Sequence, residues 1–196
     1  MPRLHQNITK SPNQILEINA QSIGYYLASI KMAINEESSN GAKLPGDTPV
    51  SGSSSPAPFF YMLERLKTTK REGWRRRRIP HGESISDHMY RMSLITMFAP
   101  QSLSSKINIP HYTKMSLVHD IAEALVGDIT PMDRVIKHEK SRREETTIDY
   151  FTSSLLGKVN SGITGEEIYD IWREYEDGET LESKFVQDVN KIELVL

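Results

Sequence analysis

The chain of 196 residues contains no cysteine, which excludes disulfides and thiolate metal sites. A bound metal would need histidine, aspartate, glutamate or backbone oxygen as ligands. No apolar run approaches the 18 or so residues that predict a membrane-spanning helix. The formal net charge of -2 argues against a surface built throughout for nucleic acid or an anionic membrane.

The N-terminus lacks the charged and then apolar pattern of a secretory signal peptide. The cytosol is therefore the expected location. A weak mitochondrial presequence is the alternative, because the first acidic residue is Glu17 and presequences are poor in acidic residues.

Residues 36–58 are rich in Ser, Gly and Pro and have no apolar periodicity. Such a segment cannot bury enough apolar surface to order itself, so we predict that residues 1–58 form a flexible, largely disordered extension. The folded domain is predicted over residues 59–196. Its last apolar stripe stops without a capping signal, so the C-terminal end looks truncated. One short amphipathic helix is expected in the extension, at Ile23, Leu27, Ile30 and Ile34.

Across the predicted domain, apolar residues recur at helical spacing, and no convincing alternation typical of strands appears. This pattern predicts an all-α domain. We expect Ser86 to cap the second helix and a capping box at Thr164 and Glu167 to open the fifth. Gly127 and Gly157 are expected to end the third and fourth. The apolar stripes run over residues 59–66, 92–99, 115–125, 148–155, 168–175 and 185–196.

The third stripe contains SLVHDIAE (116–123), in which three ionisable residues stand among apolar ones. On a continuous helix, His119 and Glu123 are four positions apart, and Asp120 and Glu123 are three apart, so all three project to one side. Buried ionisable groups need a partner. Imidazole and carboxylate ligands together suit a divalent cation such as Mn, Co, Zn or Mg.

Two more residues are candidates for this site. His88 lies at the head of the preceding helix, on the face of Met92 and Ile95, and is expected to point inward. Asp128 follows Gly127 in the turn GDITP, from which a carboxylate can hold an ion. Spacing alone leaves simpler readings open for both, namely a satisfied or surface histidine and an ordinary turn aspartate.

Four ordered blocks resemble the HD-domain phosphohydrolases, which are named for their His-Asp doublet. The closer resemblance is to the nucleoside 5'-monophosphate phosphatase (5'-deoxynucleotidase) branch, which includes the eukaryotic HD domain-containing protein 2 group. It implies an HD-domain helical bundle, a divalent metal, a homodimer and hydrolysis of (deoxy)nucleoside 5'-monophosphates. The blocks are ESISDHMYRM (83–92), LVHDIAE (117–123), VGDITP (126–131) and HEKSRREE (138–145).

The resemblance also implies roles at matching positions. Three residues, His88, His119 and Asp120, would be ligands of the principal metal. Glu123 and Asp128 would hold a second, weaker metal or orient the attacking water. The carbonyl of Ile129 would lie nearby.

The last helix departs from the family pattern. The family supplies a final Asp ligand in a pattern resembling K-F-V-x-x-x-D, whereas this chain reads KFVQDVN and has Asn190 there. Asn offers a carbonyl oxygen but no charge, so reduced metal affinity and activity are expected. A helical wheel slightly prefers Asp188 as the ligand, whereas the motif prefers Asn190, which we adopt.

The basic run GWRRRRIPHGE (73–83) has three readings: a solvated surface, a nucleic-acid patch or part of a nucleotide pocket. By resemblance, Trp74 would lie beside the sugar and base, and Arg77 would bind the 5'-phosphate. Arg75, Arg76 and Arg78 depart from the usual residues. The net charge disfavours nucleic acid. The charged block 138–145 reads as helix surface without chemistry.

The sequence therefore predicts a metal-dependent phosphomonoesterase acting on nucleoside 5'-monophosphates, preferably deoxy forms. The alternative from another class is an HD protein that has lost catalysis and acts as a metal- and nucleotide-binding sensor or interaction module.

Overall fold

The computed structural model describes residues 52–196, and the helix predicted near residues 23–34 lies outside them. Within this range the chain forms helices and no strand, so the all-α prediction is confirmed there. A single antiparallel bridge joins Lys70 to Ser84. None of the described helices is long and apolar enough to cross a bilayer.

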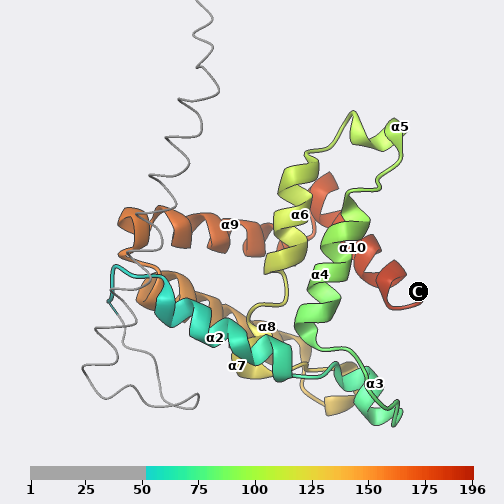
Figure 1. Cartoon of the computed structure of the whole chain (residues 1–196), viewed down its shortest axis with the longest axis horizontal. Helices are drawn as coiled ribbons and strands as arrows, with labels where there is room; N and C mark the ends of the chain where they lie inside the picture. Colours follow the sequence, from blue (N-terminus) through green and yellow to red (C-terminus); the bar gives the residue numbers. More distant parts are fainter. Residues whose placement is uncertain (1–51) are drawn as a thin grey trace, which may run out of the picture. The chain divides into compact units, whose positions relative to one another are not determined.

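The helices follow one another with short connections (Figure 1). The first, α2 (Ala57–Thr68), begins before the predicted domain start at residue 59. The other α-helices are α3 (Glu72–Arg76), α4 (Ile85–Thr96), α5 (Gln101–Ser104), α6 (Ile109–Val118), α7 (Glu123–Val126), α8 (Lys137–Asp149), α9 (Ile163–Asp177) and α10 (Leu181–Glu193). Three further elements are the 3-10 turns η1 (Pro131–Asp133) and η3 (Val159–Gly162) and the π-helical η2 (Tyr150–Leu155), which continues α8.

Two clusters of apolar side chains form the core. The first lies mainly between α2, α7, α8 with η2, and α9, and includes Phe151 and Trp172. The second lies between α4, α6, α9 and α10 and includes Tyr112 and Val186. Val118, the last residue of α6, packs against both clusters. The residues that follow Val118 therefore lie where the two clusters meet.

The start of α4 is capped by Ser84, so the prediction of Ser86 was wrong by two positions. The Ser84 hydroxyl accepts a bond from the Asp87 amide at 3.1 Å, and the Asp87 carboxylate accepts one from the Ser84 amide at 2.8 Å. This reciprocal pair satisfies two amides that the helix leaves free. It also fixes the first turn of α4, from which His88 projects.

The capping box predicted at Thr164 is also wrong. Gly162, with φ of +90°, precedes the first residue of α9, after Asn160 and Ser161 in left-handed conformations. This sharp turn starts the helix two residues earlier than predicted, so Thr164 lies inside it and accepts a bond from the Asn160 side chain at 2.9 Å.

The second stripe is shorter than predicted. Because α4 ends at Thr96, Phe98 lies beyond the helix and is 84% exposed.

The helix ends predicted at Gly127 and Gly157 agree with the structure. Gly127, with φ of +73°, follows α7, and a Cβ at Gly157 would lie 2.2 Å from the Ser153 carbonyl oxygen, immediately after η2.

Candidate metal centre

The His-Asp doublet lies in a break between α6 and α7. The His119 amide still bonds to the Met115 carbonyl at 2.9 Å, four residues back. The next bonds span only three residues: Ile121 to Val118 at 3.1 Å and Glu123 to Asp120 at 3.0 Å. The continuous helix predicted over 115–125 is therefore wrong, and so is the spacing argument that placed His119 and Glu123 on one helical face.

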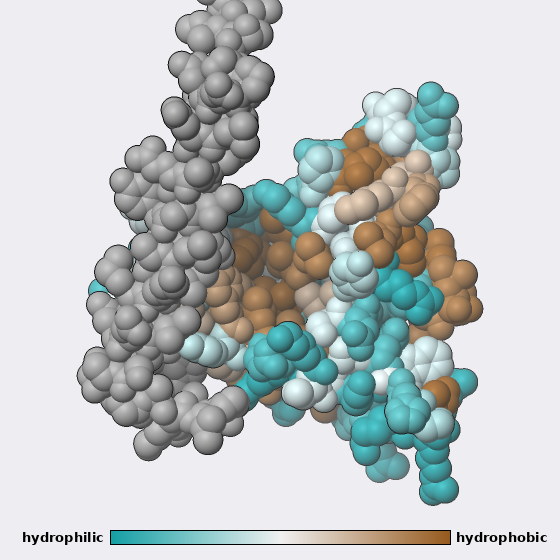
Figure 2. Space-filling view, in the orientation of Figure 1, coloured by the Kyte–Doolittle hydropathy of each residue, from teal (hydrophilic) through white to brown (hydrophobic). Residues whose placement is uncertain are grey.

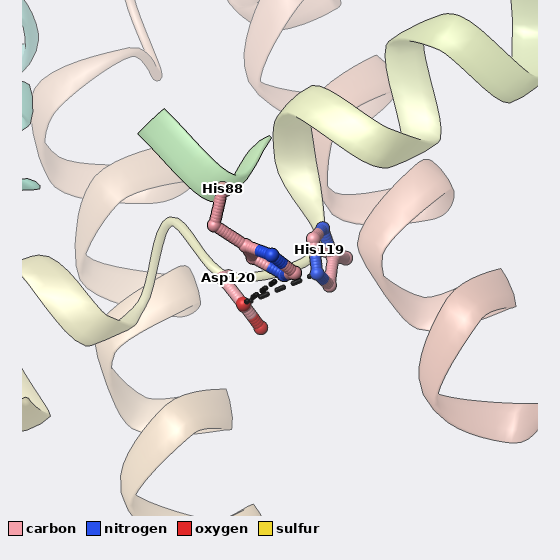
Figure 3. Close-up of side chains that lie close together, drawn as sticks. All are labelled: His88, His119 and Asp120. Carbon is pink, nitrogen blue, oxygen red and sulfur yellow. Dashed lines mark ion pairs between the residues drawn. The ribbon is translucent and has the colours of Figure 1, made fainter. Parts of the chain in front are cut away.

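The break brings both residues of the doublet next to His88 of α4. Figure 3 shows the three side chains pointing toward one another. Atom Oδ2 of Asp120 lies 3.1 Å from His119 Nε2 and 3.7 Å from His88 Nε2. Both imidazoles are inaccessible to solvent, and the carboxylate is mostly buried. Three potential ligands thus converge, as the sequence predicted for this trio.

The outer nitrogens of the two rings are already engaged. His119 Nδ1 lies 2.9 Å from the Ser116 carbonyl oxygen, and His88 Nδ1 lies 2.6 Å from Glu193 Oε2. The Ser116 carbonyl can only accept, and so can the ionised Glu193 carboxylate that pairs with Arg91. With these acceptors each Nδ1 is the donor, and a neutral ring carries its lone pair on Nε2. Both Nε2 atoms are buried and have no hydrogen-bond partner among the described residues.

Lone pairs facing a carboxylate are unfavourable unless a cation lies between them. Two neutral imidazoles and one carboxylate are donors that divalent Mn, Co, Zn and related ions accept. The residues present therefore fit a divalent metal.

The electrostatics of the site support this donor set. Burial, and then the nearby Arg71, lowers the pKa of His88 to about 4, so the ring is neutral at pH 7. Burial by itself would raise the pKa of Asp120, but His119, His88 and Arg71 outweigh it and hold the pKa well below its usual range. The carboxylate is therefore ionised at pH 7.

Residues 63–196 match the HD domain family. The chain belongs to this family. The 5'-deoxynucleotidase hdd1 of Schizosaccharomyces pombe is 43% identical to it over 143 residues, which cover 73% of this chain and 70% of hdd1. The 5'-deoxynucleotidase HDDC2 of Homo sapiens is 37% identical over 145 residues, which cover 74% of this chain and 67% of HDDC2. The predicted membership of the 5'-deoxynucleotidase branch is confirmed by these relatives.

A solved structure has a similar fold. The HD domain-containing protein YGK1 of Saccharomyces cerevisiae superposes with a TM-score of 0.54 and 32% sequence identity. The match covers 71% of this chain and 61% of that one.

The two carboxylates predicted for a second metal, Glu123 and Asp128, follow the doublet in sequence, and the charges of Asp120 and Asp128 both act on Glu123. Glu123 is buried, and its Oε2 has no hydrogen-bond partner among residues 52–196. Burial and then the charges of Asp120 and Asp128 raise the pKa of Glu123 well above its usual value. Asp128 is half-buried and accepts a bond from the Glu72 amide at 2.7 Å, which ties the loop after α7 to the start of α3. Ile129 follows it, also half-buried.

The two candidates on α10 differ in position. Asp188 is exposed and pairs with Lys191 at 2.9 Å. The Asn190 amide donates to the Tyr175 hydroxyl at 2.9 Å, and the Tyr175 ring lies 4.8 Å from the His119 ring between centroids. Asn190 is therefore on the side of α10 nearer the doublet, as the motif indicated.

The residues of the basic run differ in their contacts and exposure. Trp74 is half-buried, and its indole NH donates to Glu83 at 2.9 Å. Arg75 and Arg76 both pair with Glu72. Arg77 is exposed, and its guanidinium makes no ion pair or hydrogen bond within residues 52–196. The structure does not bring Arg77 to the trio.

Three site residues escaped the sequence analysis. Arg71, just before α3, lies with Nη1 3.4 Å from Asp120 Oδ2. Glu193 contacts His88 across 105 positions of sequence. Lys140 belongs to the block that the sequence analysis interpreted as helix surface, but it is partly buried. Its neighbours Arg142 and Arg143 are exposed and pair with Glu139, so most of the block does lie on the surface. Only Arg71 had a signal, since it directly precedes the helix that carries Trp74.

Glu144 of α8 is expected to make the free energy of unfolding depend on pH. Burial raises its pKa to about 7, although Lys140, 3.5 Å away, opposes the rise. The folded protein then binds more protons than the unfolded chain between pH 4.5 and 7, so the free energy of unfolding falls as pH rises through this window. We expect Glu144→Gln to remove a dependence of at most about 3 kcal/mol.

The measurement is urea unfolding of the metal-free protein at pH 5 and pH 8. Glu145→Gln, an exposed neighbour paired with Arg173, is the matched control and should retain the dependence. Equal pH dependence in wild type and Glu144→Gln would contradict the assignment.

Proposed function

We propose that the chain is a metal-dependent 5'-deoxynucleotidase that hydrolyses deoxynucleoside 5'-monophosphates to nucleoside and phosphate. One observation carries the proposal: two neutral imidazole lone pairs and an ionised carboxylate converge in a buried centre with no partner between them. The names of the relatives support the substrate class.

A divalent ion held here would polarise phosphate oxygens and lower the pKa of water. The proposed ligands of the principal ion are His88, His119 and Asp120, completed by Asn190. Glu123, Asp128 and the Ile129 carbonyl are proposed to serve a second ion or to orient water. Candidate ions are Mn, Co, Mg and Zn.

The protein's own groups would bind and orient the nucleotide. Arg71 is mostly buried and its guanidinium lies beside Asp120, so it is suited to a bidentate contact with the 5'-phosphate. Glu83 fixes the Trp74 indole through its NH, and the ring is proposed to pack against the sugar or base. Glu123 is proposed to hold the attacking water, because its buried Oε2 has no other partner in the described region.

The test is phosphate release from dAMP, dCMP, dGMP, dTMP and AMP with each ion in turn. We expect release from the deoxy substrates and its loss in His119→Ala. Binding of metal and nucleotide without turnover would instead support the sensor, and salt-sensitive binding of an oligonucleotide would support a nucleic-acid protein.

Replacing Arg71 tests whether Arg71, which lies beside Asp120, or Arg77, which the sequence motif indicated, binds the 5'-phosphate. We expect Arg71→Met to raise KM for dAMP by about 10- to 100-fold, because a charge-assisted bond to phosphate contributes about 1.5–3 kcal/mol. Arg77→Met is the matched control and should leave KM nearly unchanged. The reverse result, with only Arg77→Met raising KM, would restore the sequence-based assignment.

A homodimer is also proposed. Figure 2 shows hydrophobic side chains around the C-terminal end of α4, where Leu94, Met97 and Phe98 are exposed. Apolar surface of this kind supports an interface. Light scattering should give twice the chain mass, and Phe98→Asp should give a monomer.

The cytosolic location stays a prediction from sequence.

A further inference from the structure

Glu193 is a buried acid that the proposed reaction does not use directly. It is the last residue of α10, and its side chain has no solvent exposure. Its Oε2 lies 2.6 Å from Nδ1 of His88, whose ring is equally buried. A carboxylate in such a place is costly unless it is fully paired.

Arg91 supplies an ion pair to the other carboxylate oxygen, which has no hydrogen-bond partner among the described residues. Its Nη1 lies 3.2 Å from Glu193 Oε1, and its Nη2 donates to the Glu193 carbonyl at 3.5 Å. Arg91 also lies 3.9 Å from Glu83, the carboxylate that fixes Trp74. Glu83 thus pairs with Trp74 and Arg91. Within residues 52–196, Glu193 is the one residue that forms a hydrogen bond with the His88 ring.

These contacts argue against Glu193 as a metal ligand itself. Glu83, His88 and Glu193 lie close enough together to hold an ion. However, the 2.6 Å separation from Nδ1 is that of a hydrogen bond and leaves no room for an ion between them. The guanidinium of Arg91 on the other oxygen would also repel a cation.

We propose that Glu193 is a positioning residue that fixes the tautomer and orientation of His88. By accepting a hydrogen bond from Nδ1–H, it keeps that proton on Nδ1 and leaves the lone pair on Nε2, which points to Asp120. Carboxylates that hold ligating histidines in this way typically affect metal affinity by 10- to 100-fold. This inference rests on the proposed role of His88 as a ligand.

The test compares metal affinity in Glu193→Ala and Glu193→Gln by calorimetry with Mn and Co. We expect Ala to weaken binding about tenfold or more and Gln to weaken it less, because its amide oxygen can still accept from Nδ1. Imidazole nitrogen NMR of the metal-free protein should show His88 protonated on Nδ1 in wild type. It should show a mixture of tautomers in Glu193→Ala.

Glu174→Ala is the matched control. Glu174 makes a pair of the same length, 2.6 Å, with His111 on a different part of the domain. Its removal should leave metal affinity and the His88 spectrum unchanged, so a general loss of stability is separated from a specific effect.

His88→Ala distinguishes failure of the proposed metal centre from failure of the proposed role of Glu193. If His88→Ala leaves metal affinity intact, the proposed metal centre is wrong. If His88→Ala weakens binding and Glu193→Ala binds like wild type with an unchanged tautomer, only the role of Glu193 is overturned.

Discussion

Asp120→Asn should abolish phosphate release from dAMP, with a loss of about 1,000-fold or more, because a few kcal/mol of metal-dependent stabilisation disappear. In the part of the chain that the structure describes, Asp120 is the one carboxylate that approaches both imidazole Nε2 atoms, at 3.1 and 3.7 Å. Asparagine keeps the shape but not the charge. Calorimetry should show metal affinity lower by about 100-fold, since ligand charge sets the affinity for a divalent ion.

The matched control is Asp188→Asn, which removes a carboxylate that is exposed and paired with Lys191. It should leave both affinity and rate unchanged, and circular dichroism should show both variants folded. If Asp188→Asn lost metal affinity and Asp120→Asn did not, Asp188 would be a ligand and the centre proposed here would be wrong.

Asn190→Asp should raise metal affinity about 10- to 100-fold by adding a negative charge beside the doublet. The substitution is compatible with the local contacts. Burial raises the pKa of Tyr175, so its hydroxyl stays protonated and can donate to an aspartate where it now accepts from the asparagine amide. Phosphate release at limiting metal should increase with the affinity.

Lys191→Gln changes the net charge by the same amount at the next, exposed position and should have little effect. An Asn190→Asp protein with the metal affinity and rate of wild type would show that this position contributes no ligand. The expected reduction of activity in the natural chain would then have no basis.

Periodicity predicted the helices well where one face is buried, as at Phe59, Met62 and Leu66 of α2. It could not predict the break after Val118, because the apolar pattern runs on through Ile121 and Ala122 while the backbone changes from four-residue to three-residue bonds. The doublet was found from its motif rather than from helix geometry.

The rest of the site depends on packing between distant segments. Nothing near Glu193 in sequence indicates that it meets His88, because the contact exists only when α10 packs on α4. The sequence cannot distinguish the arginines from Arg71 to Arg78, because they share one side chain and differ only in burial. Arg71 is next to Asp120, whereas Arg77 faces solvent.

The position of the doublet has a consequence for the unfolded chain. An ion bound by His88 and His119 would close a loop of about 30 residues, and in the chain-entropy model such a covalent link stabilises a fold by up to about 4 kcal/mol. A protein without cysteine would thereby have a cross-link that chelation removes and metal restores, so its resistance to unfolding would report how much metal the surroundings supply.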